Sequence, residues 1–172
     1  QTRALAELID AAIEAAHVRG HVHGPQLASL EAFVRQYYRF VVPQDLVGRD
    51  PLDVSGAALS HLELAEQRTP GTALVRVLAP TADNDGWQSP HTVVQVVTDD
   101  MPFLVDSVSA ELTRSDHSIH LVIHPVLTVR RDAIGRAAEL RLVDAGERRG
   151  GPVLVQRRRA HGQRGRLRAA RQ

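Results

Sequence analysis

The chain has 172 residues, of which 43% are hydrophobic and only 3% aromatic, so it can form one domain with an aliphatic core and a helical segment before it. The sequence contains no cysteine, which excludes disulfides, thiolate metal sites and thiol nucleophiles, and no lysine, which excludes a lysine-dependent active site. No apolar stretch is long enough to span a membrane and no secretory signal is visible, so we expect a cytoplasmic protein without membrane contacts.

Charge is distributed unevenly along the chain. All 20 acidic residues lie at or before Glu147, and seven arginines fall after Gln156, which leaves 14 basic residues against the 20 acids of the body. Beyond Gln156 there is neither apolar periodicity nor any acid, so we expect residues 146–172 to form a disordered, arginine-rich tail. Clustered arginines attract nucleic-acid phosphates, but the tail lacks aromatic residues for stacking and the body is acidic, so nucleic-acid binding is the weakest alternative.

Residues 1–70 are predicted to form a helical N-terminal segment. Apolar residues recur at steps of three and four in 2–18 and 25–40, which is typical of amphipathic helices. Pro43 is expected to end the second helix. A third helix is predicted from Asp50, as N-cap, and Pro51, in the first turn, to about residue 67, although Gly56 weakens this prediction.

Residues 71–145 are predicted to form an α/β module, because the composition becomes β-branched after the turn at 69–71. Strands are expected over 73–78 and 92–98, with a polar loop between them that carries the one tryptophan. A helix from Pro102 to about 114 should precede a long alternating strand over 119–130 and a short return strand over 139–143. Pro125 indicates an edge position or a bulge in the long strand.

The corner between the second strand and its helix carries Asp99, Asp100, Met101, Pro102 and Phe103. One aspartate is expected to cap the helix that follows. The aspartates could also serve acid–base catalysis or hold a hard cation, but the helix cap and solvated first turns explain them without chemistry. A strand end that meets a helix N-terminus also suits the carboxylate of a small ligand.

No metal or catalytic site is predicted. His17, His21 and His23 have a spacing that could converge at a helix end, but Gly20 interrupts that helix. His120 and His124 share a strand face roughly 13 Å apart, at about 3.3 Å per residue, which is too far to bind one ion. The chain also has no glycine-rich dinucleotide turn, Walker loop or nucleophile elbow.

The runs VVQVVTDDMPFLVDSVSAELTR, IHLVIHPVLTVRRDAIG and AFVRQYYRFVVPQDLVGRDP closely resemble the N-terminal region of the large bacterial NAD-specific glutamate dehydrogenases. The similarity covers roughly residues 1 to 145. It implies a much longer parent enzyme that oxidises L-glutamate to 2-oxoglutarate and ammonia with reduction of NAD, in which this part is an ACT-like regulatory region. Dehydrogenase chemistry in the family depends on lysine and lies far downstream.

In the ACT pattern, small effectors, often amino acids, bind against the loop between the first strand and first helix, which corresponds here to Asp99, Asp100, Met101, Pro102 and Phe103. The resemblance therefore implies an α+β fold: N-terminal helices, then an incomplete ACT-like (ferredoxin-like) strand–helix–strand unit with a disordered basic tail. The expected third strand, second helix and fourth strand of the ACT order are not recognisable. An out-of-frame or degenerate end is our hypothesis for the change at Arg157.

The sequence thus predicts a non-catalytic regulatory fragment that holds no cofactor itself, with NAD bound elsewhere in the parent enzyme. Its expected partners are the downstream dehydrogenase domains, further copies in a homo-oligomer and an amino-acid effector. The alternative is a structural interaction module without a small-molecule ligand.

Overall fold

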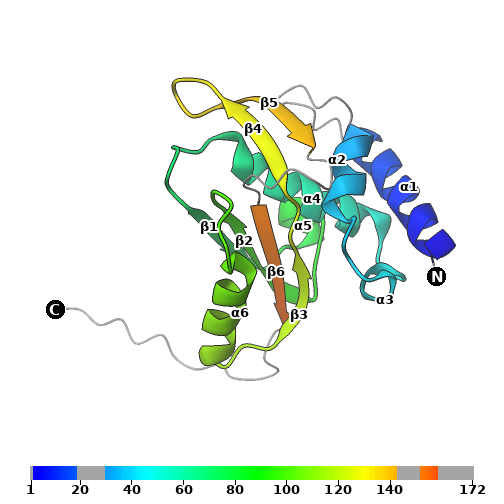
Figure 1. Ribbon diagram of the computed structural model, residues 1–172. Helices are drawn as coiled ribbons and strands as arrows, with labels where there is room; N and C mark the ends of the chain where they lie inside the picture. The colour runs from blue at the N-terminus through cyan, green and yellow to red at the C-terminus, as the bar shows by residue number, and fades with distance from the viewer. Residues whose placement is uncertain (1, 19–29, 143–151, 159–172) are drawn as a thin grey trace.

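The computed structural model describes residues 2–18, 30–142 and 152–158 of the chain. Helices α1 to α4 gather on one side of the molecule, and α6 lies apart from them (Figure 1). The helices are α1 (Thr2–Val18), α2 (Leu30–Tyr37), α3 (Pro43–Leu46), α4 (Pro51–Glu66), α5 (Ala82–Asp85) and α6 (Leu104–Arg114). The strands are β1 (Leu74–Leu78), β2 (His91–Val97), β3 (Ile119–Ile123), β4 (Leu127–Arg131), β5 (Ala137–Leu142) and β6 (Pro152–Arg158).

The predicted first and third helices are confirmed as α1 and α4. Asp50 caps α4 as expected, because its carboxylate accepts a hydrogen bond from the backbone N–H of Leu52 at 2.8 Å, and Pro51 occupies the first turn. The second helix is shorter than predicted, since α2 ends at Tyr37; residues 25–29 of that prediction lie outside the described residues. Pro43 begins the short helix α3 instead of marking a simple stop.

Four strands form an antiparallel sheet in the order β1-β2-β6-β3. Strands β2 and β3 both run antiparallel to β6, so they are parallel to each other, and α6 connects them across it. This is the split strand–helix–strand arrangement of ferredoxin-like folds. Strands β4 and β5 form a separate antiparallel hairpin. The predicted α+β class and its central strand–helix–strand unit are confirmed.

Two parts of the sheet differ from the sequence-based expectation. Strand β6 lies within the tail predicted to be disordered, and it pairs with both β2 and β3; residues 143–151 and 159–172 lie outside the described part. The long strand predicted over 119–130 is divided into β3 and β4, with Pro125 between them. Proline has no N–H to donate to a strand partner, which accounts for the interruption.

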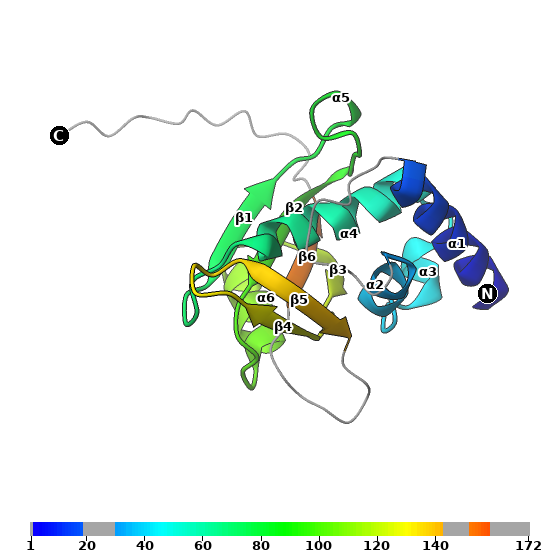
Figure 2. The same ribbon diagram turned by 90° about the horizontal axis from the view of Figure 1, so that it is seen from above.

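The two faces of the sheet are covered by different layers. Val93 of β2 is fully buried in the main core with residues of α1, α2 and α4, which Leu121 and Ile123 of β3 also join. Val94 and Val96 point to the other face, where they pack with α6 side chains. Seen from above, α4 runs along the sheet (Figure 2). The alternation of the strands thus buries both faces.

Candidate functional site

The predicted effector loop is an exposed corner between the end of β2 and the start of α6. All of its candidate residues, Asp99, Asp100, Met101, Pro102 and Phe103, are exposed to solvent. Met101 and Phe103 retain 47% and 76% of their accessible surface, which is unusual for large apolar side chains beside a sheet. The structure therefore brings the predicted residues together on one surface.

Phe103 holds the corner in a strained backbone conformation. Its φ of 61° lies in the left-handed region, and it is the residue that directly precedes α6. No side chain caps this helix among the described residues, so the prediction that Asp99 or Asp100 would do so is wrong. The physical reason is position: a capping oxygen must belong to the residue next to the first turn, and the chain uses Pro102 and Phe103 to make the bend.

Asp99 is held instead by the buried guanidinium of Arg68, with which it forms an ion pair through Nη2. The Arg68 side chain is only 7% exposed, whereas that of Asp99 is 60% exposed. Arg68 also donates through Nη1 to the carbonyl of Thr72 at 2.9 Å, and its backbone N–H donates to the carbonyl of Gly135 at 3.0 Å. One residue therefore ties the corner to the turn before β1 and to the β4–β5 turn.

Sequence reasoning missed Arg68. It follows the last turn of α4 in a polar stretch without periodicity, and no local pattern distinguishes it from the other arginines. Its role depends on Asp99, 31 residues further along the chain.

A second arginine, Arg131 of β4, lies in the same cluster. It donates to the carbonyls of Ala65 at 2.8 Å, Glu66 at 3.3 Å and Gly135 at 3.0 Å, and so satisfies the C-terminal end of α4, where positive charge is favourable. Partial burial lowers the pKa of Arg131, the charge of Arg68 lowers it further, and Asp99 opposes the change. These three charges therefore interact.

Asp100 acts on a different neighbour. The pKa of His124 is lowered by burial, and the negative charge of Asp100 opposes this shift. The Nε2 atom of His124 is buried and has no hydrogen-bond partner among the described residues. The charges of the two aspartates thus act on different groups: Asp99 pairs with Arg68, and the charge of Asp100 acts on the pKa of His124.

The other sites considered from sequence stay apart from the corner. In residues 2–18, 30–142 and 152–158, no three potential metal-ligating side chains come together, and His21 and His23 lie outside this part. A shallow hollow is lined by Tyr38, Asp53, Trp87 and neighbouring residues, but not by the corner. No helix in the described ranges has the length and apolar character needed to cross a bilayer.

Comparisons with known proteins identify the domain. A family model described as glutamate dehydrogenase, ACT1 domain, matches residues 33–166. An NAD-specific glutamate dehydrogenase of Halomonas elongata is 38% identical over 132 residues, which is 75% of this chain and 8% of that protein. An NAD-specific glutamate dehydrogenase of Pseudomonas aeruginosa is 38% identical over 120 residues, which is 70% of this chain and 7% of that protein. No solved structure shows a significant match.

The chain spans less than a tenth of the length of these relatives, and the family model covers most of the chain. The matched range begins in α2 and includes the whole sheet and the corner. The chain belongs to the family of the ACT1 domain of glutamate dehydrogenases.

Proposed function

We propose that this chain is a regulatory, non-catalytic part of an NAD-dependent glutamate dehydrogenase, and that its corner, residues 99–103, contacts an amino-acid effector. The parent enzyme would oxidise L-glutamate to 2-oxoglutarate and ammonia in the cytoplasm as a homo-oligomer, with NAD bound outside this chain. The relatives, which are NAD-specific glutamate dehydrogenases, support the parent reaction. The absence of lysine supports a non-catalytic role.

The observation that carries the effector proposal is an exposed loop on a buried support. Asp99, Met101 and Phe103 present one carboxylate and two large apolar side chains to solvent, while buried Arg68 fixes the loop from beneath. Binding sites commonly combine such exposed groups with a rigid scaffold. The corner also precedes a helix whose first turn is not capped by any side chain in the described part of the chain, which suits a ligand carboxylate.

A second candidate is subunit contact without a small-molecule ligand. The exposed apolar side chains of Met101 and Phe103 favour it, as do those of Val75 and Val77 on the edge strand β1. Exposed apolar groups of this kind often mark protein interfaces. In this case a corner substitution would change the oligomeric state and not the response to an amino acid.

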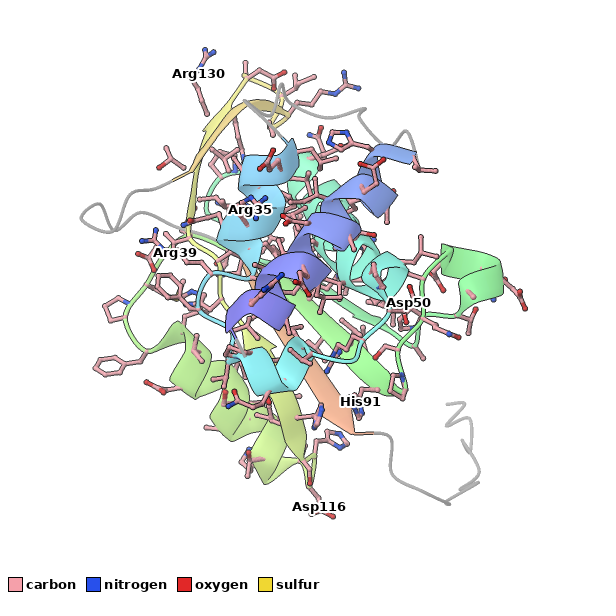
Figure 3. The ribbon with its side chains drawn as sticks, turned by 90° about the vertical axis from the view of Figure 1, so that its right-hand side faces the viewer. Arg35, Arg39, Asp50, His91, Asp116 and Arg130 are labelled. Atoms are coloured by element: carbon pink, nitrogen blue, oxygen red, sulfur yellow. The ribbon has the colours of Figure 1, made fainter. Side chains whose placement is uncertain are left out.

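The two candidates can be separated with Phe103→Gly in the full-length enzyme. Glycine adopts the left-handed conformation without strain, so the change removes the ring and keeps the bend. Asp116→Gly is a matched control, because Asp116 has a similar φ of 59° and lies beyond the other end of α6 (Figure 3). Both variants should fold, and only Phe103→Gly should change function.

The readout is NAD reduction with L-glutamate in the presence of a panel of other amino acids, together with the mass of the oligomer in solution. Effector binding predicts that Phe103→Gly and Asp100→Ala weaken the response to one amino acid and leave the mass unchanged. A changed mass with an unchanged response would establish the interface instead. An Asp116→Gly enzyme as impaired as Phe103→Gly would show that the corner has no special role.

A further inference from the structure

We infer that Arg68 is the carboxylate-binding group of the corner, and that Asp99 occupies it as an internal substitute when no ligand is bound. This inference rests on the proposed effector function and gives it a ligand chemistry, that of a small free carboxylate. Arg68 lies two residues after the end of α4 and is not part of the corner itself.

The ion pair is asymmetric in a way that permits exchange. Arg68 is buried and held by two further hydrogen bonds, to Thr72 and through its backbone to Gly135, so the cation stays in place. Asp99 belongs to an exposed loop, and its carboxylate is 60% exposed. A buried guanidinium needs a charged partner, and any carboxylate that reaches Nη2 can serve as one. A ligand would therefore displace the exposed carboxylate of Asp99 and not the buried guanidinium of Arg68.

The local charge also favours an anion. Arg131 lies near enough to Arg68 for its pKa to be lowered by that charge, and its hydrogen-bond partners are carbonyl oxygens. Asp99 forms its ion pair with Arg68, and Arg131 adds a second positive charge nearby that is bound, among the described residues, only to carbonyl oxygens. A carboxylate that entered beside Arg68 would gain from both cations.

This arrangement would connect ligand binding to the rest of the domain. Arg68 contacts the corner through Asp99, the turn before β1 through Thr72, and the β4–β5 turn through Gly135. Release of Asp99 would free the corner while the Arg68 support stayed intact. The position of the corner would then depend on whether Asp99 or a ligand carboxylate is bound to Arg68.

The test is chemical rescue of Asp99→Ala in the 172-residue chain. Loss of the carboxylate leaves Arg68 buried without its partner, so the melting temperature should fall. Sodium acetate should restore about half or more of the lost melting temperature with saturable dependence, since a ligand that binds only the folded state stabilises it. Sodium chloride at equal ionic strength and neutral acetamide should not restore it.

Two variants control the interpretation. Asp50→Ala also removes an exposed aspartate that makes a hydrogen bond, but that bond is to a helix N–H and leaves no buried cation, so acetate should not rescue it (Figure 3). Asp99→Asn keeps the side-chain shape and removes the charge, and it provides the same test if Asp99→Ala does not fold. Arg68→Gln combined with Asp99→Asn should abolish the response to acetate.

Titration calorimetry with L-glutamate then tests the competition directly. If Asp99 occupies the binding group, Asp99→Asn should bind L-glutamate about tenfold or more tightly than the unmodified chain, because the competing state is removed. Equal rescue of Asp50→Ala, or no rescue of either Asp99 variant by acetate or L-glutamate, would overturn the inference. In that case Phe103→Gly could still weaken the response of the full-length enzyme to an amino acid, so the inference can fail while the proposed function stands.

Discussion

The hydroxyl of Tyr37 on α2 lies 2.9 Å from Nδ1 of His61 on α4, and both side chains are fully buried. On its other side, Nε2 of His61 lies 3.2 Å from the carbonyl oxygen of Val96 on β2. The carbonyl can only accept, so Nε2 carries the proton and Nδ1 accepts from the tyrosine. This chain of hydrogen bonds connects two helices to the strand that leads to the corner.

Tyr37→Phe should destabilise the chain by about 1–3 kcal/mol, because it leaves Nδ1 of His61 buried without a donor. Urea unfolding followed by circular dichroism measures the change. Tyr38→Phe is the matched control: its hydroxyl donates to the carbonyl of Val54, a helical residue, at 2.6 Å, so removal should cost less. Equal losses in the two variants would contradict the special role of the histidine.

Stability should fall as the pH is lowered from neutrality. Burial lowers the pKa of His61 to about 3, below its usual value of 6.5. The unfolded chain therefore takes up a proton at His61 in this window and the folded chain does not. The free energy of unfolding should decrease by up to about 1.4 kcal/mol per pH unit from this residue as the pH falls below about 6.5 toward 3.

Urea unfolding at several pH values tests this slope. His61→Gln retains a donor for Val96 and an acceptor for Tyr37 but cannot titrate. The dependence of its unfolding free energy on pH should therefore correspond to about one proton fewer taken up on unfolding. A slope that His61→Gln does not reduce would show that other groups cause the acid sensitivity.

Gly56, within helix α4, leaves the space that the side chain of Trp87 occupies. A Cβ added at Gly56 would overlap the Cβ and Cγ atoms of Trp87, which is only 4% exposed. Gly56→Ala should therefore lower stability by about 1–3 kcal/mol despite the better helix propensity of alanine. Circular dichroism melts would show whether Trp87→Leu lowers stability less in the Gly56→Ala background than in the unmodified chain. Additive losses would argue against this contact.

The elements best predicted from sequence are those whose cause is local. Helix α4 is an example, since its cap at Asp50 and its first-turn proline adjoin each other. Strand β6 was not predicted, because its apolar run, 153–155, is only three residues long and arginines follow it directly. Its two neighbours in the sheet, β2 and β3, supply its hydrogen bonds.

The position of the corner between a strand and a helix was predicted correctly, but the residue that supports it was not. The exposed residues from Asp99 to Phe103 follow from a strand end and a helix start, which are local signals. One of the two aspartates was expected to cap the helix, whereas Asp99 pairs with Arg68, which is 31 residues away in the sequence. Ion pairs between residues far apart in the chain have no characteristic sequence spacing from which they could be predicted.

Gly135 should be the more sensitive of two glycines with the same backbone conformation. Its φ is +81° and that of Gly71 is +79°, so alanine at either site should cost about 1–2 kcal/mol from the left-handed conformation alone. A Cβ at Gly135 would also lie 2.6 Å from the carbonyl oxygen of Arg68, whereas nothing lies within 4 Å of one at Gly71. Gly135→Ala should therefore lower the melting temperature more than Gly71→Ala does.

Gly135→Ala should also speed amide hydrogen exchange in β4 and β5, because the hairpin would lose its backbone contact with Arg68. Equal melting temperatures with unchanged exchange would mean that the hairpin does not depend on this contact.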